Sequence, residues 1–209
     1  MTASMPPSDC IPGTNLPMLE FFPVDALTID AVAGWVADDK ARPWLDLGGG
    51  RQAMSARELF LMLTAPRNHA RLFREPGGDR PLGLVCLNDA VNQMGSAEVW
   101  GVRGSYAGGP RNVSVAAFLL MLATGFVDLD RQVIGSWVVD GNGLSLMMHH
   151  RLKLTETGRQ RRRHLMNGVL HDRILFDITR DEFAQRFGAV PAESGRTLDS
   201  LRSKELIHA

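Results

Sequence analysis

The stretch that decides the fold begins at Ala97-Glu-Val-Trp-Gly-Val102 and continues through a glycine- and proline-rich loop, a long apolar run at 113–128 and a β-rich run at 131–139. The first and last segments are rich in Val, Ile and Trp, which predicts strands. The run at 113–128 is long enough to predict a helix. It is too short, and too often interrupted by small and polar residues, to predict a membrane span. Strand, loop, helix and strand therefore form the predicted centre of the molecule.

Working outward, the chain offers further elements on both sides. Strands are predicted at 18–24, 70–73, 81–87 and 173–179, a helix from Asp25 to before Pro43, a second from Ser55, and a third at 144–152. Ser55 followed by Glu58 is typical of a capping box. The order β-α-α-β-β-β-α-β-α-β predicts an α/β fold with a mixed, mostly antiparallel sheet flanked by helices. We assign residues 1–17 to a flexible arm, 18–187 to the domain and 188–209 to a polar tail.

Composition limits the classes of function. The 209 residues carry 23 basic and 23 acidic side chains and have no net charge, so we expect neither nucleic acid nor membrane as a partner. Cys10 and Cys86 form neither a disulfide framework nor a zinc spacing, and we expect no metal. The first residues lack the charged and apolar regions of a signal peptide. The expectation is therefore a cytoplasmic protein.

Several short motifs occur in an order that resembles one family. They are Ala97-Glu-Val-Trp100, Gly125-Phe126, Asp140-Gly-Asn-Gly-Leu-Ser145, and Asp172 with Ile174–Ile178 and Thr179-Arg-Asp-Glu-Phe183. From about residue 18 to 183 the chain resembles the GNAT N-acetyltransferases, in the branch that includes the ribosomal-protein N-terminal acetyltransferases. The resemblance implies the acyl-CoA N-acyltransferase fold. It also implies acetyl transfer from acetyl-CoA to a primary amine by direct attack in a ternary complex.

The resemblance also implies where the acyl donor binds. The family holds the CoA pyrophosphate on backbone amides at a helix start, where the helix dipole favours an anion. The corresponding positions here, together with those along the pantetheine arm, are Trp100, Val102, Gly108, Gly109, Arg111, Asn112, Val113, Ser114, Asn142 and Ser145. The usual Arg or Gln falls on Gly109, and the two usual small residues fall on Asn112 and Ser114. This departure leaves an acyl-carrier protein open as donor in place of CoA.

Two residues are candidates for proton transfer. Glu98 lies on an apolar strand, where burial would raise the pKa of its carboxyl group and suit it to act as a base. His149 follows Asn142 by seven residues, the position at which many family members carry a Tyr near the departing sulfur. A histidine at that position is a candidate acid. The competing interpretations are a solvated strand glutamate and an exposed helix histidine beside His150.

The loop at 45–52 allows two interpretations. Asp46-Leu-Gly-Gly-Gly50 resembles the first motif of S-adenosylmethionine-dependent methyltransferases, but Pro43 argues against the buried strand that such a motif requires. In the acyltransferase interpretation the loop lies beside the acceptor, and Trp44, Asp46, Arg51 and Gln52 are candidates for binding it. The acceptor is then a small-molecule amine or a protein N-terminus.

A basic run, Arg159–Arg163, precedes the last predicted strand. Such a run is typical of a solvated edge strand or hairpin, and contact with RNA, an acidic carrier protein or a phosphorylated substrate is the competing interpretation. At the level of the whole chain, a GNAT-fold protein that binds CoA or a carrier protein without turnover is a second candidate function. The sequence also leaves a homodimer open.

Overall fold

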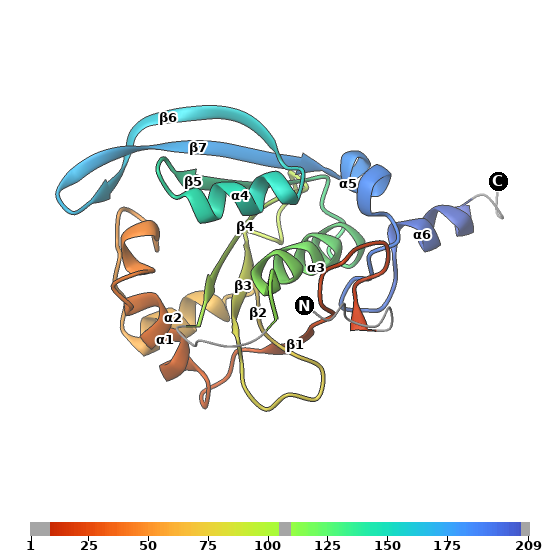
Figure 1. The fold of residues 1–209 in the computed structure, drawn as a ribbon, viewed down its shortest axis with the longest axis horizontal. Helices are drawn as coiled ribbons and strands as arrows, with labels where there is room; N and C mark the ends of the chain where they lie inside the picture. Colours follow the sequence, from red (N-terminus) through yellow and green to blue (C-terminus); the bar gives the residue numbers. More distant parts are fainter. Residues whose placement is uncertain (1–8, 105–109, 206–209) are drawn as a thin grey trace, which may run out of the picture.

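The computed structural model describes residues 9–104 and 110–205, excluding the side chains of 202–205. Seven strands form one sheet in the order β1-β2-β3-β4-β5-β7-β6 (Figure 1). The strands are β1 (Glu20–Pro23), β2 (His69–Arg74), β3 (Gly83–Asn88), β4 (Ser96–Arg103), β5 (Val133–Val139), β6 (Thr155–Met166) and β7 (Val169–Thr179). Among these strands only β4 and β5 are parallel neighbours, and the other adjacent pairs are antiparallel. The predicted mixed, mostly antiparallel sheet is confirmed.

The two parallel strands separate along their length. Pairing between β4 and β5 covers Ser96–Glu98 of β4 and stops there. The rest of β4, from Val99 to Arg103, pairs with β3 on its other side. Backbone amide and carbonyl groups on the β5 side of this segment therefore have no ladder partner among the described strands. This opening between β4 and β5 is a splay in the sheet.

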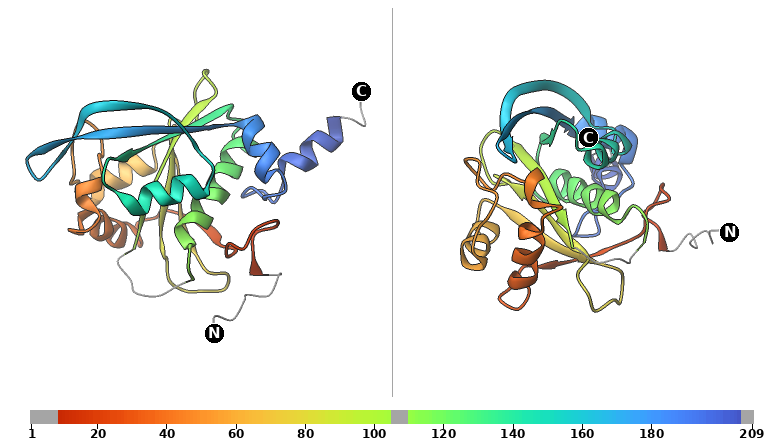
Figure 2. Two further views of the ribbon diagram at one scale, coloured as in Figure 1. Left: turned by 45° about the horizontal axis from the view of Figure 1, so that its top comes forward. Right: turned by 60° about the vertical axis from the view of Figure 1, so that its left-hand side comes forward.

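Helices cover both faces of the sheet (Figure 2). One face carries α1 (Ile29–Ala37), the short 3-10 turn η2 (Arg42–Trp44) and α2 (Ala56–Leu63). The other carries α3 (Val113–Val127) and α4 (Gly143–Arg151), and α5 (Arg180–Phe187) and α6 (Leu198–Glu205) follow the last strand. Separate buried clusters of apolar side chains fill the two faces, with α3 almost wholly buried in one of them. The two faces meet at the splay.

Local sequence signals explain several element ends. Ser55 and Glu58 form the predicted reciprocal capping box at the start of α2. Helix α1 begins at Ile29 and not at Asp25, because the Asp25 carboxylate accepts hydrogen bonds from the amides of Leu27 and Thr28 and makes a turn before the helix. The basic run at 159–163 lies on β6, the edge strand of a long hairpin with β7. The predicted edge hairpin is therefore confirmed.

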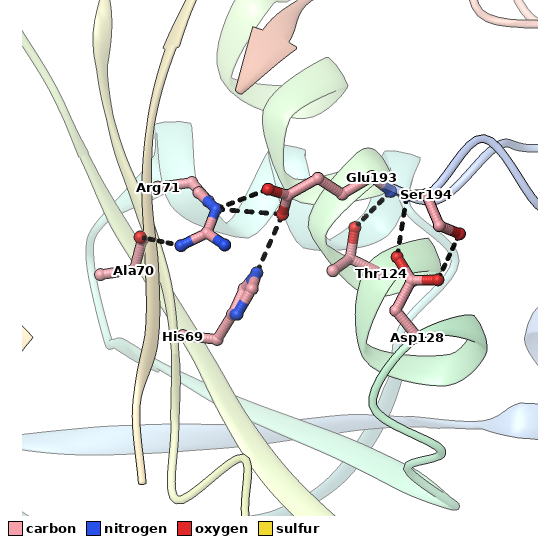
Figure 3. A network of polar contacts seen from close by, with 7 residues as sticks. All are labelled: His69, Ala70, Arg71, Thr124, Asp128, Glu193 and Ser194. Carbon is pink, nitrogen blue, oxygen red and sulfur yellow. Dashed lines mark hydrogen bonds and ion pairs between the residues drawn. The ribbon is translucent and has the colours of Figure 1, made fainter. Parts of the chain in front are cut away.

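The terminal segments pack more tightly than the sequence predicted. Ile11 is fully buried, and a bridge between Cys10 and Pro17 closes its turn, so the described part of the predicted flexible arm packs against the core. In the predicted polar tail, the Glu193 carboxylate accepts hydrogen bonds from His69 and Arg71 of β2, and the Glu193 amide donates to the hydroxyl of Thr124 on α3 (Figure 3). The described parts of both segments therefore pack against the core of the domain. Within the described chain, no helix is long and apolar enough to cross a membrane.

Candidate active site

A cavity of about 1290 Å³ crosses the sheet at the splay. Glu98, Trp100 and Trp137 line it on the face of α1 and α2, whereas Ser136 and His149 line it on the face of α3 and α4. Alternation along each strand explains this division, because Ser136 and Trp137 are consecutive residues of β5 and point to opposite faces. A molecule bound in the splay would therefore be reached from both faces of the sheet.

Glu98 lies at the last paired position of β4, opposite Gly135 of β5. Its exposed surface borders the cavity, and the surrounding protein withdraws the carboxyl group from bulk water. This burial raises its pKa, against the opposing effects of a hydrogen bond from Trp137 and the positive charge of Arg173. A carboxylate with a raised pKa at the edge of the splay is suited to accept a proton from a bound amine.

His149 forms a buried pair with Ser136 on the opposite face. The imidazole is 2% exposed and contacts the rings of Phe118 and Phe176. Its Nδ1 lies 2.8 Å from the carbonyl oxygen of Ser145, and its Nε2 lies 2.9 Å from Oγ of Ser136. Burial lowers the pKa of His149, so the neutral ring is favoured. Since a carbonyl oxygen only accepts, Nδ1 carries the proton and the Ser136 hydroxyl donates to Nε2.

The loop at 45–52 is fastened to the β6–β7 hairpin. Asp46 forms an ion pair with Arg173 of β7, and both side chains are largely buried. The Arg173 guanidinium stacks on Trp137, 3.8 Å from the ring centroid, and donates at 3.5 Å to Nδ1 of His164. Nε2 of His164 in turn lies 2.7 Å from the Pro43 carbonyl oxygen. These contacts place the loop as a wall of the cavity on the Glu98 face.

The beginning of α3 forms the opposite end of the cavity. Asn112 precedes the helix with φ of +63° and makes no side-chain cap, so its left-handed backbone fits the tolerance of asparagine for this conformation. Its side-chain oxygen accepts a hydrogen bond from Arg151 of α4. The first amides of α3 are therefore not capped by this side chain, and such amides are suited to hold an anion.

Three solved structures share this architecture across most of the chain. The spermidine N-acetyltransferase of Vibrio cholerae in complex with CoA and spermine has a TM-score of 0.70 and 14% identity over 79% of this chain and 97% of that one. RimJ of Mycobacterium smegmatis in complex with CoA-disulfide has a TM-score of 0.65 and 19% identity over 78% of this chain and 83% of that one. The ribosomal-protein-S5-alanine acetyltransferase of Vibrio fischeri has a TM-score of 0.64 and 13% identity over 78% and 94%.

The chain has the GNAT acetyltransferase fold. No family model and no curated protein matches the sequence. At these low identities the likeness shows the fold, and roles for individual residues depend on the geometry of this chain.

Most of the described residues that were predicted to hold the acyl donor line the cavity. The described ones that line it are Trp100, Val102, Asn112, Ser114, Asn142 and Ser145. Val113 is fully buried behind them, and exposed Arg111 does not line the cavity. Asn142 accepts a hydrogen bond from the Ser145 amide and so caps α4, and the Trp100 indole donates to Asn88. Gly108 and Gly109 lie outside the described residues.

The predicted acceptor residues divide into lining and anchoring groups. Trp44, Asp46 and Arg51 line the cavity. Gln52 instead donates to the Leu165 carbonyl at 2.7 Å and joins the loop to β6. Three glycines at 48–50 have positive φ, and the Asp46 carboxylate accepts from the amides of the first and third. The segment follows η2 and not a strand, which argues against the methyltransferase motif.

Sequence reasoning missed two residues of this site, Ser136 and Arg173, because each occupies an ordinary position of a predicted strand. Trp137, which also lies on a predicted strand, lines the cavity as well. The signal available in the sequence was alternation, since Arg173, Leu175 and Asp177 share one face of β7.

Proposed function

We propose that this GNAT-fold protein transfers an acetyl group from acetyl-CoA to a primary amine by direct attack in a ternary complex. The observation that carries the proposal is the continuous cavity through the splay, with a base on one face and a hydroxyl–imidazole pair on the other. Two of the structural neighbours are complexes with CoA or with CoA-disulfide, which supports a CoA thioester as the donor here.

The donor half fits such a thioester. The start of α3, which the Asn112 side chain leaves uncapped, offers backbone N–H groups to a pyrophosphate. The edge of β4 that is unpaired among the described strands offers backbone groups to the amides of a pantetheine arm. Asn142 uses its side-chain oxygen to cap α4 and keeps its amide N–H groups as donors. Together these groups would place the reactive carbonyl between Glu98 and Ser136.

The chemistry then divides between the two faces. Glu98 accepts the proton that the amine must lose, directly or through water. On the other face His149, in its cationic form, donates Nε2–H to Oγ of Ser136, which frees the hydroxyl proton to pass to the departing sulfur. The neutral imidazole and the intact hydroxyl remain after the transfer, so the protons balance. His149 thus acts through Ser136 and does not contact the sulfur itself.

Ligand binding and turnover test the proposal separately. Acetyl-CoA and CoA at about a hundred times the dissociation constant should each stabilise the fold by roughly 2.7 kcal/mol, whereas S-adenosylmethionine should not. Thiol release from acetyl-CoA in the presence of a panel of amines then measures transfer. Stabilisation by CoA without thiol release would indicate a binding protein that has lost turnover. Absence of stabilisation by either CoA compound would refute the donor assignment.

A further inference from the structure

The acceptor half of the cavity carries positive charge that the protein does not neutralise. Its ionisable lining residues are Lys40, Arg51, Arg67, Arg163 and Arg173, opposed by Asp38, Asp46, Asp89 and Glu98. Two of these acids are already occupied: Asp46 pairs with Arg173, and Asp89 lies 3.6 Å from Arg67. Asp38 accepts a hydrogen bond from the Lys40 backbone amide.

Arg163 and Arg51 remain with little compensation. Within the described chain Arg163 makes no ion pair, and Arg51 donates to the Gly48 carbonyl at 3.3 Å. Arg51 also lowers the pKa of Glu58 as the smallest of several effects, but hydrogen bonds from Ser55 are the main partners of that carboxylate. Both arginines are exposed at the cavity and present forked N–H donors to it.

The loop contacts bring these two arginines to the same rim. Gln52, the neighbour of Arg51, binds the Leu165 carbonyl, and His164, the neighbour of Arg163, binds the Pro43 carbonyl. A register shift between Gln160 and His164 departs from regular alternation in β6, and Arg163 lines the cavity beside this shift. Behind them lies the buried Arg173, whose Nε has no hydrogen-bond partner among the described residues.

We propose that the acceptor amine carries an anionic group, a carboxylate or a phosphate, which Arg163 and Arg51 bind at this rim while the amine reaches Glu98. The inference rests on the proposed function and narrows its substrate class. Arginine binds both anions through paired N–H donors, so the two share one recognition chemistry. A polycationic acceptor such as spermidine would meet uncompensated positive charge and is disfavoured.

Matched amines test this directly. The pairs are β-alanine against β-alaninamide and phosphoethanolamine against ethanolamine, with spermidine as the polycation, and thiol release from acetyl-CoA is the readout. Values of kcat/KM are expressed per unprotonated amine, because the anionic group itself changes the amine pKa. We expect the anionic member of one or both pairs to be favoured about tenfold, the factor that roughly 1.4 kcal/mol supplies. The pair that shows the preference identifies the bound group as a carboxylate or a phosphate.

Variants locate the effect. Arg163→Gln, alone and combined with Arg51→Gln, should abolish the preference by lowering kcat/KM for the anionic amine toward that of its neutral partner. Arg161→Gln is the matched control, since Arg161 lies on the same strand but outside this cavity. Equal rates within both pairs, a best rate with spermidine, or a preference that survives the double variant would each overturn the inference.

Failure of the proposed function is distinguishable from failure of the inference. If no amine releases thiol, equilibrium dialysis of labelled β-alanine and phosphoethanolamine against CoA-saturated protein replaces the rate assay. The anion site is upheld without the transfer reaction if the wild type and Arg161→Gln retain β-alanine or phosphoethanolamine and Arg163→Gln does not. Absence of such retention overturns the site as well.

Discussion

Replacement of Asp46 by Asn should destabilise the whole fold, because it leaves Arg173 as a buried cation without its carboxylate. Removal of one partner from a buried ion pair costs about 3–5 kcal/mol. The side chains of Asp46 and Arg173 keep 14% and 10% of their surface exposed, which favours the lower end, about 3 kcal/mol. With a urea m-value of roughly 2 kcal/mol/M, the unfolding midpoint should fall by about 1.5 M.

Urea unfolding followed by tryptophan fluorescence measures this loss, and a double-mutant cycle shows whether it belongs to the pair. Asp46→Leu with Arg173→Met removes both charges and should be far less costly than the sum of the single changes. Additive single losses, or a midpoint shift of Asp46→Asn below about 0.3 M, would refute the reasoning.

The loss of unfolding free energy in Asp46→Asn should also depend on pH. Burial alone would raise the pKa of Asp46, but hydrogen bonds from Arg173, Gly50 and Gly48 outweigh it and hold the pKa below its ordinary value. A lowered folded pKa contributes stability above the unfolded pKa of about 3.9, and this contribution is lost as pH falls through the folded value. The unfolding free energies of the wild type and of Asp46→Asn should therefore converge at acid pH.

Three further outcomes are expected. Glu98→Gln should lower kcat/KM by about a hundredfold or more and remove the acid limb of the pH–rate profile, measured by thiol release. Ser136→Ala should lower kcat about a hundredfold, the low side of general acid catalysis, yet leave thermal stabilisation by CoA unchanged, because the alanine keeps the strand and removes only the hydroxyl. Glu193→Gln should lower the free energy of unfolding in urea by about 1–2 kcal/mol, since its carboxylate joins the C-terminal segment to His69 and Arg71. An unchanged free energy of unfolding would mean that the segment is held by its apolar contacts alone.

The central elements were predictable because their signals are local. The apolar run of α3, the β-rich run of β5 and the capping box at Ser55 each depend on residues within a few positions of one another. The position of Glu98 on the cavity face follows from alternation with buried Val99. The tolerance of Asn112 for a left-handed backbone was likewise a property of the residue type.

The remaining parts depend on contacts between distant segments. Arg173 is separated from Asp46 by 127 positions, so no local pattern could show that its charge is neutralised inside the protein. Strand β6 is polar because it forms the sheet edge, which hides it from a search for apolar alternation. Ile11 stands alone in a polar, proline-rich start, and only the folded core supplies the surface that buries it.

The proton arrangement at His149 decides how the two faces would cooperate. Its Nδ1 faces a carbonyl oxygen and can only donate, so the neutral ring must accept the Ser136 proton at Nε2. Only the cationic ring reverses that bond and releases the hydroxyl toward the sulfur. Burial lowers the pKa of His149 and raises that of Glu98, so the pH range in which the base is ionised and the acid is protonated becomes narrow.

The rate per unprotonated amine should therefore rise with pH as Glu98 ionises and fall as His149 loses its proton, with a maximum on the acid side of neutrality. His149→Phe should remove the falling limb and leave the rising limb in place. A wild-type rate that stays level through alkaline pH would mean that water, and not the Ser136–His149 pair, protonates the thiolate.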